Sequence, residues 1–191
     1  LPPKRANFSR GVPSENFSSS AAGAVVPKLI IAHQPTWGLD IGAVPAELEA
    51  VVRLVRGVTA KPLIVKLTPN TADVGLCAQA AEAAGADAVS LINTLRAAPL
   101  HPDGSGRPWL GGRQGGLSGP AIRVVALAQV AAVAARVAIP IVGMGGVQRG
   151  RHAADLLDAG ATLVAVGTES FRDPRSGERV ASELAHLRPA A

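Results

Sequence analysis

Five polar or glycine-rich clusters in this sequence directly follow short apolar runs. If those runs are buried strands, the clusters lie at strand ends, where α/β proteins bind their ligands. A lysine, an Asn-Thr pair and several glycines are residue types that hold anions and flat polar molecules. The clusters span residues 65–70, 90–94, 115–120, 143–146 and 167–168.

The first cluster, VKLTPN, places Lys66 inside an apolar run. Burying a lone ammonium group is costly unless a negative group faces it. Two interpretations are open at this point: a salt-bridged or snorkelling lysine at a strand end, or a cation held against an anionic ligand. The neighbouring clusters favour the anionic ligand.

The second cluster ends in Asn93 and Thr94. Such a pair directly after a strand is often simple loop capping. The same side chains can hydrogen-bond the amide and carbonyl edges of a flat polar substrate. Taken alone, the pair favours neither interpretation.

The three glycine-rich clusters form a stronger pattern. The segment GGLSGP leads into a helix that begins with Pro120, so glycine backbone and free N–H groups meet at a helix start. Gly143-Met-Gly-Gly and Gly167-Thr168 then follow two consecutive strands. This arrangement is typical of barrels that hold a phosphate after strands seven and eight, although glycine turns alone are common.

The elements that position these clusters alternate regularly. Ala-Gly-Ala-Asp at 84–87 and Ala-Gly-Ala-Thr at 159–162 both predict a helix that ends at a glycine before a strand. The alternation requires a parallel sheet, and both a doubly wound sheet and a (β/α)8 barrel fit it. Strands are predicted at 25–31, 62–67, 87–92, 139–142 and 163–166, helices at 45–59, 71–84, 120–137, 150–159 and 177–187, a long loop at 95–116, and no packed structure at 1–24.

Composition excludes several classes of protein. Hydrophobic residues make up 48% of the 191 residues, which is typical of one globular domain. The net charge is +5, but residues 1–36 hold +3 of it, so no nucleic-acid partner is expected. Cys77 is the single cysteine, which rules out a disulfide or a cysteine-rich metal site within the chain. No membrane span or signal peptide is apparent, and we expect a cytoplasmic protein without a metal site.

Together, the clusters resemble the C-terminal half of dihydroorotate dehydrogenases, specifically the bacterial class 1B catalytic subunit. The matching stretches are LIVKLTPN at 63–70, SLINTL at 90–95, GGLSGPAI at 115–122, IPIVGMGGV at 139–147 and VGT at 166–168. The resemblance implies a partial (β/α)8 TIM barrel made of strands five to eight with their helices. It divides the chain into an unmatched, irregular segment at 1–37 and the C-terminal half of an FMN-binding barrel at 38–191.

The resemblance also implies roles for individual residues. Asn93 and Thr94 would contact dihydroorotate, which the family oxidises to orotate in pyrimidine (UMP) biosynthesis. A partner subunit with FAD and an iron–sulfur cluster would pass the electrons to NAD, and a homo-oligomer is expected. The implied FMN contacts are Lys66, Ile92, Gly119, Gly145, Gly146, Gly167 and Thr168.

One part of the family's pattern is missing. The family's base is a cysteine in a pattern like Asn-x-Ser-Cys-Pro-Asn, which belongs just before Gly38, where this sequence reads LIIAHQPTW. His33 lies near that position with nothing else to support it as a base, and Cys77 is interpreted as a small core residue. We therefore expect no catalytic base and no activity of this chain alone, and a frameshift or truncation upstream of Gly38.

Two alternatives stay open. A related FMN barrel, such as a dihydropyrimidine dehydrogenase module, would share most of the motifs, although Leu117 and Met144 favour the orotate branch. The chain could instead be a non-catalytic remnant that binds a flavin or a phosphate.

Overall fold

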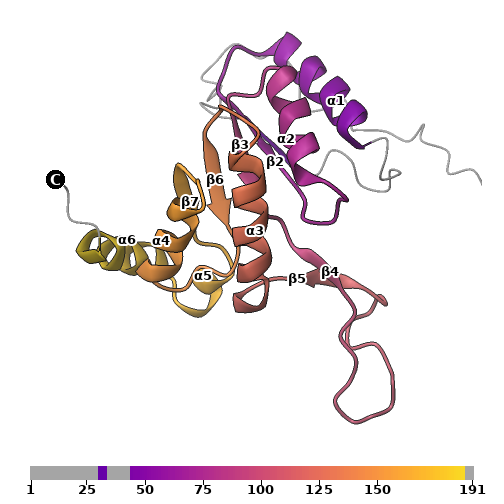
Figure 1. Cartoon of the computed structure of the whole chain (residues 1–191). Helices are drawn as coiled ribbons and strands as arrows, with labels where there is room; N and C mark the ends of the chain where they lie inside the picture. The colour runs from indigo at the N-terminus through magenta and orange to yellow at the C-terminus, as the bar shows by residue number, and fades with distance from the viewer. Residues whose placement is uncertain (1–29, 34–43, 188–191) are drawn as a thin grey trace, which may run out of the picture.

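The protein is built around one parallel sheet. The computed structural model describes residues 30–33 and 44–187. Its main sheet has five strands in the order β1-β2-β3-β6-β7, and every neighbouring pair is parallel (Figure 1). Apart from the β4–β5 hairpin, strands that are neighbours in the sheet follow one another along the chain. The strands are β1 (Ile30–His33), β2 (Leu63–Lys66), β3 (Ala88–Leu91), β6 (Ile141–Met144) and β7 (Leu163–Ala165).

Five helices follow the strands and pack against each other in chain order: α1 on α2, α2 on α3, α3 on α4 and α4 on α6. The core lies between these helices and one face of the sheet. Leu63 and Val65 on β2 are fully buried in it, whereas Ile64 between them is only half-buried. These five helices are α1 (Val44–Val58), α2 (Val74–Ala83), α3 (Arg123–Ala134), α4 (Gly150–Asp158) and α6 (Ser176–Leu187).

Local sequence explains where the helices begin and which side they bury. The Asp73 side chain accepts hydrogen bonds from Gly75 N at 2.9 Å and Leu76 N at 3.2 Å, which caps the start of α2. Leu48 and Val52, four residues apart on α1, are buried in the core. The Ala-rich sequence of α2 lets that helix lie close to its neighbours.

Most predicted elements are confirmed, with small shifts. The strand predicted at 25–31 lies at Ile30–His33, within the segment 1–37, and the rest of that segment lies outside the described residues. The helix predicted at 120–137 opens with the 3-10 turn η2 (Pro120–Ile122) before α3 and ends at Ala134. The short helix α5 (Glu169–Arg172) was not predicted, because four residues are too few to show a period.

The long loop predicted at 95–116 is confirmed at 98–114, and only its ends differ from the prediction. Its ends form an antiparallel hairpin of β4 (Leu95–Ala97) and β5 (Gly115–Leu117), which projects from the body in Figure 1. Between them, the rings of His101 and Trp109 stack with centroids 5.4 Å apart. Three-residue strands, one of them containing two glycines, show no apolar alternation from which to predict them.

Within the described residues, none of the helices has the length and apolar character needed to span a membrane.

Candidate functional site

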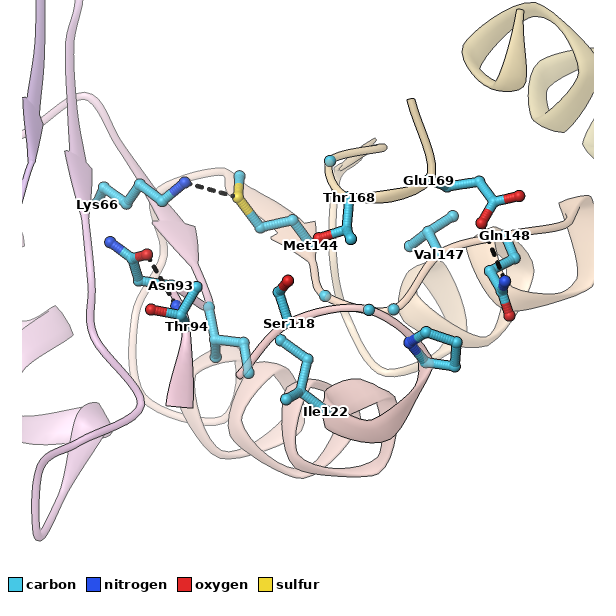
Figure 2. Close-up of a pocket in the computed structure, with 16 residues that line it drawn as sticks. Lys66, Asn93, Thr94, Ser118, Ile122, Met144, Val147, Gln148, Thr168 and Glu169 are labelled. Atoms are coloured by element: carbon cyan, nitrogen blue, oxygen red, sulfur yellow. Dashed lines mark hydrogen bonds between the residues drawn. The ribbon is translucent and has the colours of Figure 1, made fainter. Parts of the chain in front are cut away.

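A pocket of about 150 Å³ opens at the carboxyl ends of β2, β3, β6 and β7 (Figure 2). The structure brings together in it every residue that the sequence singles out as a cofactor or substrate contact. It adds several residues that the sequence reasoning missed. The lining residues are Lys66, Ile92, Asn93, Thr94, Ser118, Gly119, Pro120, Ile122, Met144, Gly145, Gly146, Val147, Gln148, Gly167, Thr168 and Glu169.

Lys66 closes one end of the pocket. It is the last residue of β2 and is half-buried, and its Nζ donates to Met144 Sδ at 3.2 Å. A thioether is a weak acceptor, and no carboxylate of the described residues forms an ion pair with this lysine. Burial lowers the pKa of Lys66. The salt-bridged interpretation therefore finds no partner in the described part of the chain, and the cation is available to an anionic ligand.

Asn93 and Thr94 lie beside Lys66, just after β3. Thr94 N donates to Asn93 Oδ1 at 2.8 Å. From the loop after β2, Asn70 Nδ2 donates to Thr94 O at 2.9 Å, and Asn70 Oδ1 accepts from Arg96 N at 2.7 Å. These bonds fix the path of the backbone through residues 93–96, so both polar side chains are presented at the pocket wall.

Gly145 and Gly146 form the turn after β6 at the other end of the pocket. Their φ angles are +130° and +70°, which side-chain-bearing residues rarely adopt. A Cβ on Gly146 would lie 2.8 Å from Gly119 O and 2.8 Å from Arg123 Cβ. The turn thus packs directly against the start of η2 and α3, and only glycine permits that approach.

Gly167 and Thr168 face this turn from the end of β7. A Cβ built on Gly167 would meet nothing within 4 Å, so the backbone there borders open space. Thr168 contributes a hydroxyl to the same wall (Figure 2). Two glycine turns, a threonine and a helix start around one cavity meet the requirements for holding a phosphate group by backbone N–H groups.

Cys77 lies away from this pocket. It is buried on α2, with its Sγ 3.7 Å from Thr71 Oγ1, and burial raises the pKa of its thiol. Its interpretation as a core residue is confirmed. His33 aligns with Lys66 in the β1–β2 register, and its side chain lies outside the described part of the chain.

Two of the missed lining residues, Gln148 and Glu169, directly follow predicted motifs. Gln148 comes after Gly-Met-Gly-Gly-Val, and Glu169 comes after Gly167-Thr168. Their position next to the glycine turns is the sequence feature that could have indicated them as pocket residues. Over residues 30–33 and 44–187, no group of three or more His, Cys, Asp or Glu side chains is placed to hold a metal ion.

The fold and site together define an α/β protein with a glycine-lined pocket at the carboxyl ends of a parallel sheet. The family model for dihydroorotate dehydrogenase matches residues 34–187, and the chain belongs to that family.

Individual dihydroorotate dehydrogenases are also similar to this chain in sequence. The chain is 50% identical over 147 residues to the catalytic subunit of dihydroorotate dehydrogenase B (NAD(+)) from Citrifermentans bemidjiense, covering 77% of this chain and 48% of the relative. It is 43% identical over 150 residues to dihydroorotate dehydrogenase A (fumarate) from Lacticaseibacillus paracasei, covering 78% and 51%. The chain therefore spans about half the length of the relatives it matches.

A solved structure supports the fold. The crystal structure of DHODH from Eimeria tenella in complex with ferulenol superposes with a TM-score of 0.65 at 24% identity. The match covers 83% of this chain and 49% of that chain. At this identity, the likeness concerns the fold.

Proposed function

We propose that this chain forms the FMN-binding half of a dihydroorotate dehydrogenase, which oxidises dihydroorotate to orotate in pyrimidine biosynthesis. The observation that carries the proposal is the pocket that joins Lys66 at one end to the glycine turns at the other. In this proposal the five-stranded sheet is one arc of a (β/α)8 barrel, with β2, β3, β6 and β7 as its strands five to eight.

The residues present fit FMN. Its phosphate would lie against Gly145, Gly146, Gly167 and Thr168, where positive φ angles and open space allow close backbone approach. Its ring system would extend past Ile92 and Gly119 towards Lys66, the cation without an ion-pair partner in the described part of the chain. An anionic phosphate and a ring that gains negative charge thus each meet a suitable group.

FMN supplies the hydride acceptor when it is bound. The chain's own residues stabilise negative charge and orient the substrate. Lys66 stabilises negative charge at its end of the pocket, and its half-buried position strengthens that interaction relative to water. Asn93 and Thr94 orient the substrate by hydrogen bonds to its polar ring edge, on a backbone held in place by Asn70.

Among the described residues, no thiol lines this pocket, and Cys77 is buried on α2. We therefore propose that the 191-residue chain does not oxidise dihydroorotate by itself. Measurable turnover by the purified polypeptide would contradict this.

We also propose two kinds of partner. Several relatives are named catalytic subunits of dihydroorotate dehydrogenase B (NAD(+)), which supports an electron-transfer subunit with FAD and an iron–sulfur cluster as the partner. The open face of the sheet supports self-association, because Leu163 on β7 is 61% exposed and Ile64 is only half-buried.

Flavin spectroscopy tests the function. The chain is incubated with FMN, separated from free flavin by gel filtration and titrated anaerobically with dihydroorotate or dihydrouracil. Retained yellow colour without bleaching is the expected result for this chain, and it supports binding without turnover. Bleaching by dihydrouracil would favour the dihydropyrimidine dehydrogenase alternative, and failure to retain any flavin would contradict the proposal.

A further inference from the structure

Glu169 is a buried carboxylate beside the glycine turns. It is only 6% exposed and follows Thr168 directly at the start of α5. Its Oε2 accepts from Gln148 Nε2 at 3.0 Å, and its Oε1 pairs with Arg172 and lies 3.5 Å from Arg179 Nη2. The hydrogen bond from Arg172 is the main cause that lowers the pKa of Glu169, so the group is charged at neutral pH.

The Glu169–Gln148 bond joins the two turns that surround the phosphate end of the pocket. Gln148 comes two residues after the turn at Gly145 and Gly146, on the β6 side. Glu169 comes directly after Gly167 and Thr168, on the β7 side. Figure 2 shows the two side chains meeting at the edge of the pocket away from Lys66. The bond therefore sets the separation of the turns without occupying the space between them.

Arg179 of α6 ties this bond to the rest of the fold. Its Nη1 donates to Gln148 O at 2.8 Å, and its Nη2 lies 3.0 Å from Asp173 Oδ2. The same guanidinium pairs with Glu183 at 3.3 Å, whose other oxygen accepts from Gly150 N at 2.6 Å. Helix α6 thus contacts the segment after each turn.

The charges of this network argue that Glu169 is not itself a phosphate ligand. A bare carboxylate beside a phosphate would oppose binding by like-charge repulsion. Here the two arginines compensate that charge, and the carboxylate oxygens are directed to Gln148 and to the arginines. Its contribution to a phosphate site must therefore act through the position of the turns.

We propose that Gln148, Glu169 and Arg179 form a turn clamp: positioning residues that hold the two glycine turns at the separation a phosphate group requires. The proposal rests on the proposed FMN site and adds a specificity role to it. The clamp determines preference for a phosphorylated flavin over the same flavin without phosphate. Residues at the Lys66 end do not take part.

The test compares the dissociation constants of FMN and riboflavin, measured by quenching of flavin fluorescence on the full 191-residue chain. The unaltered chain should prefer FMN by about tenfold or more, since a charge-assisted hydrogen bond to phosphate contributes roughly one such factor. Glu169→Ala should lose most of that preference while its riboflavin affinity stays the same. Glu169→Gln, which can still accept from Gln148, should retain part of it.

Two further variants complete the test. Gln148→Ala should lower the FMN preference by itself, and combining it with Glu169→Ala should add little, because both changes break one bond. Glu178→Gln is the matched control. Over residues 30–33 and 44–187, Glu178 pairs only with Arg175, on the surface, so this variant should leave both affinities unchanged.

The outcomes separate the two proposals. An unaltered chain that binds FMN no better than riboflavin would contradict the phosphate site itself. An unaltered chain that prefers FMN, with the same preference in Glu169→Ala and Gln148→Ala, would overturn the clamp alone. Equal loss of FMN and riboflavin affinity in both variants would also overturn it, because it would show a general structural role.

Discussion

The two ends of the pocket are held in different ways. At the phosphate end, the turns after β6 and β7 are joined by Gln148 and Glu169 and tied to α6 by Arg179. At the ring end, the Lys66 ammonium contacts only a thioether among the described residues, Met144 Sδ at 3.2 Å. One end is fixed by charged hydrogen bonds, and at the other end the described residues offer the Lys66 ammonium no ion-pair partner.

This difference matches what each end is proposed to bind. A phosphate keeps its shape and its negative charge, so a preformed site binds it without reorganisation. A flavin ring changes charge during a reaction, and a cation without a fixed counter-ion can respond to that change. In the proposed site, affinity therefore depends on the glycine turns and redox tuning depends on Lys66.

The largest effect is expected at Gly146. In Gly146→Ala the new Cβ would lie 2.8 Å from Gly119 O, at a φ of +70°. Strain and overlap together cost about 2–5 kcal/mol, which would weaken FMN binding by at least about 30-fold. Fluorescence titration measures this. Gly57→Ala is the control, because a Cβ there meets nothing within 4 Å. Equal FMN affinity in both variants would contradict close packing at the turn.

At the opposite end, Lys66→Met removes the cation and keeps a side chain of similar length. The reduced flavin should lose stabilisation, so the two-electron potential of bound FMN should fall by about 30 mV, a factor of about ten in equilibrium. Dye-equilibrated reduction followed by absorbance measures it. Lys61→Met, which alters a lysine before the start of β2, should leave the potential unchanged. An unchanged potential in Lys66→Met would contradict the proposed position of the flavin ring beside Lys66.

The stabilisation that Glu169 contributes to the turn clamp should depend on pH. The arginines hold the pKa of Glu169 below its ordinary value of 4.5, so its stabilisation is present above that value and is lost as the pH falls through the lower folded-state pKa. The stability difference between the unaltered chain and Glu169→Gln should be constant near pH 7 and smaller at a pH well below 4.5. Urea unfolding at both pH values checks this; a difference that grows on acidification would contradict it.

The smallest effect on flavin binding is expected at Asn93. Because Asn93 lies outside the turn clamp, Asn93→Ala should change FMN affinity by less than about twofold. It should instead weaken the perturbation of the flavin spectrum by added orotate. If orotate binding is unaffected while FMN affinity falls strongly, the proposed substrate and cofactor ends of the pocket have been assigned incorrectly.

Much of the fold could be predicted from the sequence because the pattern repeats. The Ala-Gly-Ala joints at 84–86 and 159–161 and the short apolar runs mark each strand directly. The β4–β5 hairpin could not be predicted, since it depends on contact of Thr94 with Gly116 rather than on an apolar period: a Cβ on Gly116 would lie 2.4 Å from Thr94 Oγ1. The pairing of these two strands depends on tertiary contacts, and the glycines in β5 are residues that are typical of loops.

The pocket lining shows a similar division. Lys66, the glycines and Thr168 are visible in the sequence because they combine at the ends of consecutive apolar runs, as in barrels that hold a phosphate. The turn clamp is not visible, because Arg179 and Gln148 are 31 positions apart and meet only when α6 packs on α4. A charged residue on a solvent-facing helix has no sequence signature that distinguishes a clamp from a surface ion pair.

We propose above all that the FMN phosphate binds at the glycine turns and that the flavin ring lies towards Lys66. A crystal structure of the chain with FMN tests it most directly. Phosphate oxygens should lie within hydrogen-bonding distance of the backbone at Gly146 and Thr168, with the ring beside Lys66. A phosphate paired with Lys66, or FMN bound outside this pocket, would contradict it.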